Sequence, residues 1–145
     1  MNRPVVIASV VVIAVVVVGA IEVPKGIQWA FSAISDRQKS ASAFADGATA
    51  AITKAWDVES LSSLATPQYY QTVKNDGAAA WATYRLLGEL ISAKPCVTDN
   101  LQIVNGTATA ESQCPAEFKN GKASVELFTT DASGTWKITW VHVLL

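Results

Sequence analysis

The sequence predicts an α+β fold in which about three helices pack on a curved antiparallel sheet of four strands. Apolar residues recur at helical spacing between residues 26 and 94, and the rest of the chain alternates runs rich in Thr, Val and Ile with tight turns. A strongly apolar N-terminal segment also predicts a transmembrane helix ahead of this fold.

The composition excludes several classes of function. The chain has 145 residues with 11 basic and 12 acidic side chains, so it has no excess positive charge to bind a nucleic-acid backbone. One His and two Cys are too few for a typical zinc or iron–sulfur site, so we expect no metal and no cofactor. The length suits one folded domain.

The apolar segment covers residues 5–23, and Glu22 is the only charged residue in it. A spanning helix needs roughly 20 such residues, and lipid forces even a Val-rich segment to satisfy its backbone as a helix. Arg3 and the α-amino group precede the segment, which favours a single-pass signal-anchor in the inner (cytoplasmic) membrane, with the C-terminal domain on the periplasmic side. Trp29 and Phe31 follow where interfacial aromatic residues would lie.

A cleaved signal peptide is the alternative for this segment. Val18 and Ala20 fit the small-residue pattern of a cleavage site, but the apolar run exceeds the ~7–15 residues of a usual signal peptide. We therefore expect an anchor (or signal peptide) at residues 1–25, with residues 5–23 in contact with membrane lipid. An exported α+β domain would follow at residues 26–145.

The predicted helices begin with one from about residue 36 to residue 56, which has a single apolar stripe. Asp57 is placed to cap a short helix after it. Thr66 and Pro67 match the capping residue and the first residue of the next helix.

The last predicted helix covers residues 78–91, after a break at residues 75–77. Lys94 and Pro95 would close the helical half of the chain. The apolar face of this helix would comprise Trp81, Tyr84, Leu87 and Ile91.

The four predicted strands form a meander, because tight turns separate them. The turns are at residues 105–106, 120–121 and 131–134, between strands at about 96–104, 107–118, 123–130 and 135–145. A two-residue turn at Asn120-Gly121 would place six residues of the second hairpin on one core face: Phe118 opposite Ala123, Ala116 opposite Val125, and Cys114 opposite Leu127.

Cys96 and Cys114 are expected to form a disulfide, since both lie in the first hairpin of an exported domain. A regular ladder from the turn at Asn105-Gly106 would leave them one residue out of register. An extra residue at 98–100, forming a β-bulge, would bring them together. A three-residue turn would also align them but would turn the apolar side chains of the strand outward. Two reduced, buried thiols remain the further alternative.

Several short motifs resemble the nuclear transport factor 2-like (cystatin-like) superfamily over about residues 41–143. They are Trp56-Asp57, Leu61, Pro67, Leu87-Gly88-Glu89-Leu90, the run from Ala116 to Ala123, and the run from Gly134 to Ile138. The resemblance implies a cone of helices wrapped by a curved sheet, often with a pocket between them. Members of this superfamily include isomerases, cyclases, secretion-machine subunits and proteins without chemistry, so the resemblance does not select one function.

Aromatic residues and the single histidine are the candidates for lining such a pocket. Strand alternation would place His142 on the face that holds Trp136, Ile138 and Trp140, where it would be a candidate general base. A bonded surface histidine is the simpler interpretation, as capping is for Asp57, so we assign no catalytic residue. The candidate pocket-lining residues are Trp56, Tyr69, Trp81, Tyr84, Trp136, Trp140 and His142.

The function expected from these features is that of a membrane-anchored, exported accessory or assembly subunit of a larger membrane protein complex. It would act by protein–protein contact, and its partners would be other membrane protein subunits. The alternative is a binding protein for a small apolar ligand in the cone pocket. An isomerase- or cyclase-like enzyme using His142 or Asp57 is the least favoured hypothesis, because the sequence contains no recognisable catalytic motif.

Overall fold

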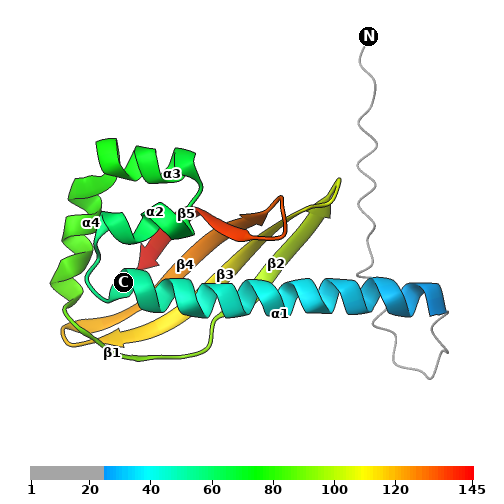
Figure 1. The fold of residues 1–145 in the computed structure, drawn as a ribbon. Coiled ribbons are helices and arrows are strands. Elements are labelled where there is room, and N and C mark those ends of the chain that lie inside the picture. Colours follow the sequence, from blue (N-terminus) through cyan, green and yellow to red (C-terminus); the bar gives the residue numbers. More distant parts are fainter. Residues whose placement is uncertain (1–24) are drawn as a thin grey trace, which may run out of the picture.

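The computed structural model describes residues 25–145, and the predicted anchor at residues 5–23 lies outside this part. One long helix, α1 (Lys25–Thr53), lies across a face of a curved five-stranded antiparallel sheet, with shorter helices gathered at one end (Figure 1). The α+β class is therefore confirmed. None of the helices in the described part combines the length and apolar character needed to span a membrane.

The first helix begins earlier than predicted, since α1 already starts at Lys25 and runs for 29 residues. Asp57 caps the 3₁₀ helix η2 (Val58–Ser60) through a side-chain oxygen that accepts a hydrogen bond from the Glu59 amide, and α2 (Leu61–Leu64) follows. Thr66 caps α3 (Pro67–Thr72) in the same way. Both capping residues predicted from the sequence are thus confirmed.

The prediction of a helix over residues 78–91 is wrong in its last part. The helix widens through a π-helical turn, η3 (Val73–Gly77), instead of breaking there, and continues as α4 (Ala78–Tyr84) and η4 (Arg85–Leu87). Gly88 then adopts φ 79°, which ends the helix. The next segment is a strand, β1 (Leu90–Ala93), so the sheet has five strands rather than four and Ile91 is exposed on β1.

The other strands agree with the predicted ones within two residues. β3 is central, because it pairs with β4 on one side and with both β1 and β2 on the other. β5 pairs with the far side of β4. The strands are β2 (Val97–Val104), β3 (Thr107–Phe118), β4 (Gly121–Asp131) and β5 (Trp136–Leu144).

The predicted bulge in β2 is confirmed. The β2–β3 ladder follows from a two-residue turn whose residues, Asn105 and Gly106, have φ values of 51° and 80°, and it shifts by one residue between Thr98 and Asn100. This shift aligns the two cysteines, which form the predicted disulfide between Cys96 and Cys114.

The second hairpin has a register two residues away from the predicted one. Phe118 pairs with Gly121, so the turn is Lys119-Asn120 rather than Asn120-Gly121. The amides of these two turn residues donate to the carbonyls of Glu89 and Leu87, which ties the turn to the segment before β1. A shift of two preserves the face of every side chain. The predicted core face therefore remains correct, with buried Cys114, Ala116, Phe118, Ala123, Val125 and Leu127.

A bulge at Thr139 in β5 overturns one prediction. The β4–β5 ladder skips this residue, which reverses the alternation beyond it. Trp136 and Ile138 are buried, whereas Trp140 and His142 are exposed. The prediction that all four share one face is wrong for this reason.

Candidate functional site

Three of the predicted pocket residues pack against each other in the core. The ring centroid of Trp56 lies 5.8 Å from that of Trp81, 5.1 Å from Tyr84 and 6.0 Å from Phe118 on β3. These rings fill the space between the short helices and the sheet, where the family resemblance implied a pocket. That they line a ligand pocket stays a prediction.

Trp136, Tyr69 and Trp140 lie elsewhere. Trp136 belongs to a smaller cluster and donates from Nε1 to Ser40 Oγ at 2.9 Å. Tyr69 packs its ring 5.6 Å from that of Trp140, and its phenolic oxygen accepts a hydrogen bond from the Val141 amide at 3.0 Å. Burial raises the pKa of the Tyr69 phenol above its ordinary value of 10.0, although the hydrogen bond from Val141 opposes this.

His142 is a bonded surface residue. Its Nδ1 lies 3.1 Å from Oε2 of Glu126, the residue directly opposite on β4. Asp57 is likewise occupied in capping η2. Within residues 25–145, no cluster of three or more His, Cys, Asp or Glu side chains is arranged to hold a metal ion.

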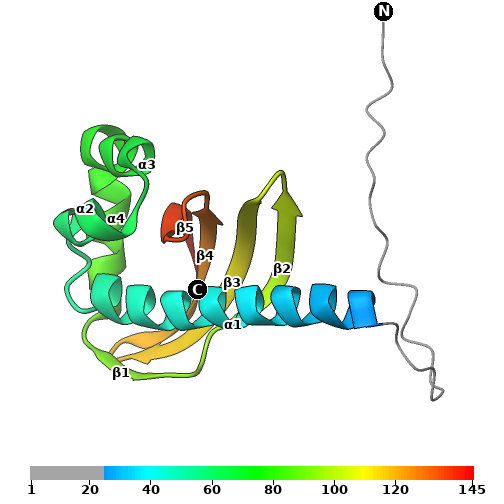
Figure 2. The ribbon, with the colours of Figure 1, turned by 45° about the vertical axis from the view of Figure 1, so that its right-hand side comes forward.

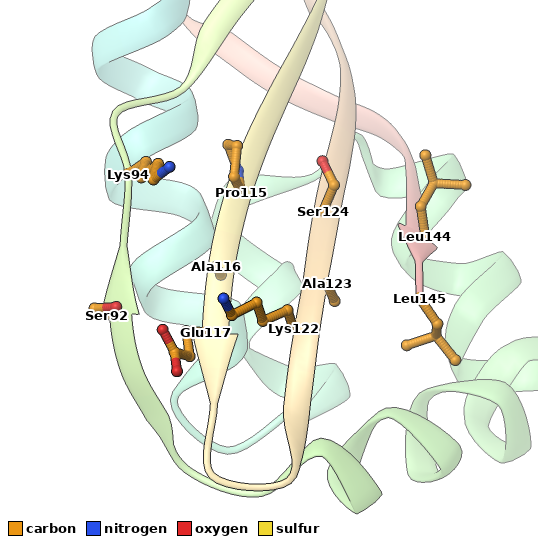
Figure 3. A pocket seen from close by; sticks show the side chains of 10 residues that line it. All are labelled: Ser92, Lys94, Pro115, Ala116, Glu117, Lys122, Ala123, Ser124, Leu144 and Leu145. Carbon is orange, nitrogen blue, oxygen red and sulfur yellow. The ribbon is translucent and has the colours of Figure 1, made fainter.

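An open hollow of about 460 Å³ lies on the face of the sheet turned away from α1 (Figure 3). Its walls are formed by residues of β1, β3, β4 and the end of β5, together with Lys94 just after β1, and its charged side chains are those of Lys94, Glu117 and Lys122. None of the seven predicted pocket residues is among its lining residues. The charges in it have mixed sign, and the residue types match no catalytic arrangement.

The strand β2 presents a free edge, a feature that the sequence analysis did not single out. In the described part of the chain β2 pairs only with β3. Because Val104 and Thr107 flank a two-residue turn, strand alternation turns the amides and carbonyls of Leu101 and Ile103 away from β3. The opposite edge of the sheet is covered, since the Thr66 amide donates to the Ile138 carbonyl of β5 and Tyr69 accepts from Val141.

After Asp99, the free edge of β2 carries no charged side chain and has exposed apolar ones. Ile103 and Val104 are 44% and 63% exposed, and no charged residue occurs from Asn100 to Ala110. Edge strands usually carry charged residues or prolines that prevent pairing with other chains. In β2 the one such residue is Asp99, the extra residue of the bulge.

The N-terminal part of α1 projects beyond this edge (Figure 2). Its first polar contacts with the sheet are made by Arg37, which pairs with Asp131, and Gln38, which donates to the Thr98 carbonyl at 2.8 Å. Before them, Ile27, Trp29, Phe31 and Ile34 are exposed.

No family model matches the sequence, and neither a curated protein nor a solved structure shows significant similarity to the chain. The resemblance to the nuclear transport factor 2-like superfamily therefore stays a prediction.

Proposed function

We propose that this protein is a membrane-anchored, exported accessory subunit of a larger membrane protein complex, and that the free edge of β2 binds its protein partner. The observation that carries the proposal is that, within residues 25–145, the backbone amides and carbonyls of Leu101 and Ile103 pair with no other strand and lie beside exposed apolar side chains. Unpaired amides and carbonyls at a sheet edge are a template on which another chain adds a strand.

The chemistry of the edge describes the segment that would bind there. It is an extended segment that supplies backbone hydrogen bonds to Leu101 and Ile103. Its apolar side chains would cover Ile103 on one face and Val104 on the other, since neighbouring residues of a strand point to opposite sides. The absence of charge from Asn100 to Ala110 suits an apolar partner segment better than a charged one.

Two further features support a contact function in an exported protein. Aromatic rings occupy the interior beside Trp56, which favours binding at the surface over enclosure of a small ligand. The disulfide between Cys96 and Cys114 suits an oxidising compartment. The membrane attachment itself rests on the apolar character of residues 5–23.

The test is native mass spectrometry of the full-length protein extracted from its own membranes in mild detergent. Wild type is compared with Ile103→Lys and with the matched control Ile91→Lys, which changes an exposed residue of β1 away from the β2 edge. We expect wild type and Ile91→Lys to appear in a heavier assembly, and Ile103→Lys to lose it by at least about tenfold.

Two results would contradict the proposal. If wild type appears as a single chain that lacks about 20 N-terminal residues, the segment is a cleaved signal peptide, since such peptides have about that length. The protein would then have neither the proposed anchor nor the proposed assembly. If both lysine variants assemble equally, the β2 edge is not the surface that binds the partner. The unfolding midpoints of the two variants are also compared. Equal midpoints show that Ile103→Lys loses the assembly without being destabilised.

A further inference from the structure

The apolar stripe of α1 is longer than the sheet that covers it. Residues that follow each other by three or four positions lie on one face of a helix. On the covered half this face holds Ala41, Ala45, Ala48 and Ile52, all buried. One turn further back the same face carries the polar residues Arg37 and Gln38, and before them it is apolar again at Ile34, Phe31 and Ile27, which are all exposed. The exposed apolar part from Ile27 to Ile34 is about 10 Å long, at about 1.5 Å of rise per residue, and it lies beyond the covered part of the helix.

The uncovered part is apolar on more than one side. Trp29 is 75% exposed and lies about 200° around the helix from Ile27, at 100° per residue. No charged residue occurs between Lys25 and Asp36. A helix exposed to water normally has a charged face, so water is a poor surrounding for this one. A groove or a single partner helix would cover the stripe and leave Trp29 outside.

The preceding chain indicates which medium can surround all sides of this segment. Residues 5–23 carry a single charge, at Glu22, and end two positions before α1 begins at Lys25. If they enter a bilayer, α1 starts at the membrane boundary. The interfacial layer favours Trp and accommodates Phe and Ile beside uncharged polar groups such as Gln28 and Ser32.

We infer that residues 26–35 of α1 lie in the interfacial layer of the lipid bilayer, so that the folded domain rests directly on the membrane surface. Asp36 and Arg37 then mark the boundary with water. The inference rests on the anchored topology of the proposed function and adds the surface that the domain presents to lipid. It leaves the β2 edge, which lies beside this segment, available to a partner in the same membrane.

The experiment uses the full-length protein in vesicles of phosphatidylcholine and phosphatidylglycerol whose acyl chains carry bromine, which quenches nearby tryptophan. The chain has five tryptophans, so wild type is compared with Trp29→Phe and with Trp140→Phe, which removes the other exposed indole. Flotation of the vesicles is measured on the same samples. Both substitutions are at exposed positions, where a change of stability above ~0.5 kcal/mol is unusual.

We expect all three proteins to float with the vesicles. Bromine quenching should occur in wild type and Trp140→Phe and fall by at least half in Trp29→Phe. Flotation with equal quenching in wild type and Trp29→Phe would overturn the inference and leave the anchor of the proposed function intact. Protein that does not float would overturn both.

Discussion

Arg37 on α1 and Asp131 at the end of β4 form an ion pair across 94 residues of sequence, with Nη1 2.8 Å from Oδ2. The other carboxylate oxygen of Asp131 accepts a hydrogen bond from the Gly134 amide at 2.6 Å. One buried carboxylate thus fixes both the β4–β5 turn and the point where α1 meets the sheet.

Replacing this carboxylate should destabilise the fold. Asp131→Ala removes both hydrogen bonds but leaves Arg37 able to reach water, so we expect the free energy of unfolding to fall by about 2 kcal/mol. Urea unfolding of the full-length protein in detergent measures it. Asp36→Ala, an exposed carboxylate one residue from Arg37, is the control and should change stability by less than ~0.5 kcal/mol. Equal effects would mean that the ion pair carries no stability.

The disulfide should account for a large share of stability. It closes a loop with a sequence separation of 18 residues, for which chain entropy predicts about 3 kcal/mol. We expect the double variant Cys96→Ala, Cys114→Ala to unfold at correspondingly lower urea concentration. Reductant should lower the midpoint of wild type and leave that of the variant unchanged. A wild type that yields free thiols without losing stability would contradict this.

Two glycines should respond to alanine in opposite directions. Gly47 lies within α1 and a Cβ there meets nothing within 4 Å, so Gly47→Ala should stabilise by about 0.5–1 kcal/mol through helix propensity. Gly88 has φ 79°, and a Cβ there would lie 3.0 Å from Asn120 Nδ2. Gly88→Ala should therefore destabilise by about 1–2 kcal/mol. Thermal unfolding of the two variants measures both signs, and a stabilising Gly88→Ala would refute the packing at this turn.

Tyr69 should make stability depend on pH above 10. Because burial raises the pKa of its phenol above 10.0, the unfolded chain loses this proton at lower pH than the folded one. The stabilisation is complete below pH 10 and is lost as pH rises toward the folded pKa. Tyr69→Phe should be less stable by about 1 kcal/mol at pH 8, since the Val141 amide loses its acceptor. Its stability should also fall less steeply between pH 10 and 11.

The control for this pH dependence is Tyr70→Phe, which removes a phenol bonded to Glu59 on the surface. Urea unfolding between pH 8 and 11 should give this variant the alkaline slope of wild type. The same slope for Tyr69→Phe would show that burial of Tyr69 does not drive the alkaline loss.

The bulges in β2 and β5 show what the sequence could and could not predict. In β2 the two cysteines acted as a distance constraint, because only an extra residue near Asp99 aligns them while keeping the apolar face. In β5 no such pair exists, so nothing in the sequence marked Thr139. Simple alternation therefore placed Trp140 and His142 on the wrong face.

The error at β1 has a different cause. Leu87 and Ile91 have helical spacing, and the end of the helix depends on Gly88, whose turn is held by Lys119 and Asn120 about thirty residues away. The periodicity of a short stretch of sequence does not reveal a contact with residues so far along the chain. The candidate site could not be predicted for a similar reason. A meander implies edge strands, but only the fold shows that Thr66 and Tyr69 lie along β5, and that within the described residues no strand pairs with the edge of β2 at Leu101 and Ile103.

The placement of α1 also sets an order of events during folding. The side-chain hydrogen bonds that join this helix to the sheet and its flanking residues span between 47 and 96 residues of sequence, whereas both hairpins of β3 close through two-residue turns. Local contacts form faster than distant ones because less loop entropy is lost. Although α1 precedes the sheet in the chain, we therefore expect it to dock after these hairpins have formed, and until then its apolar face is open to chaperones or to lipid.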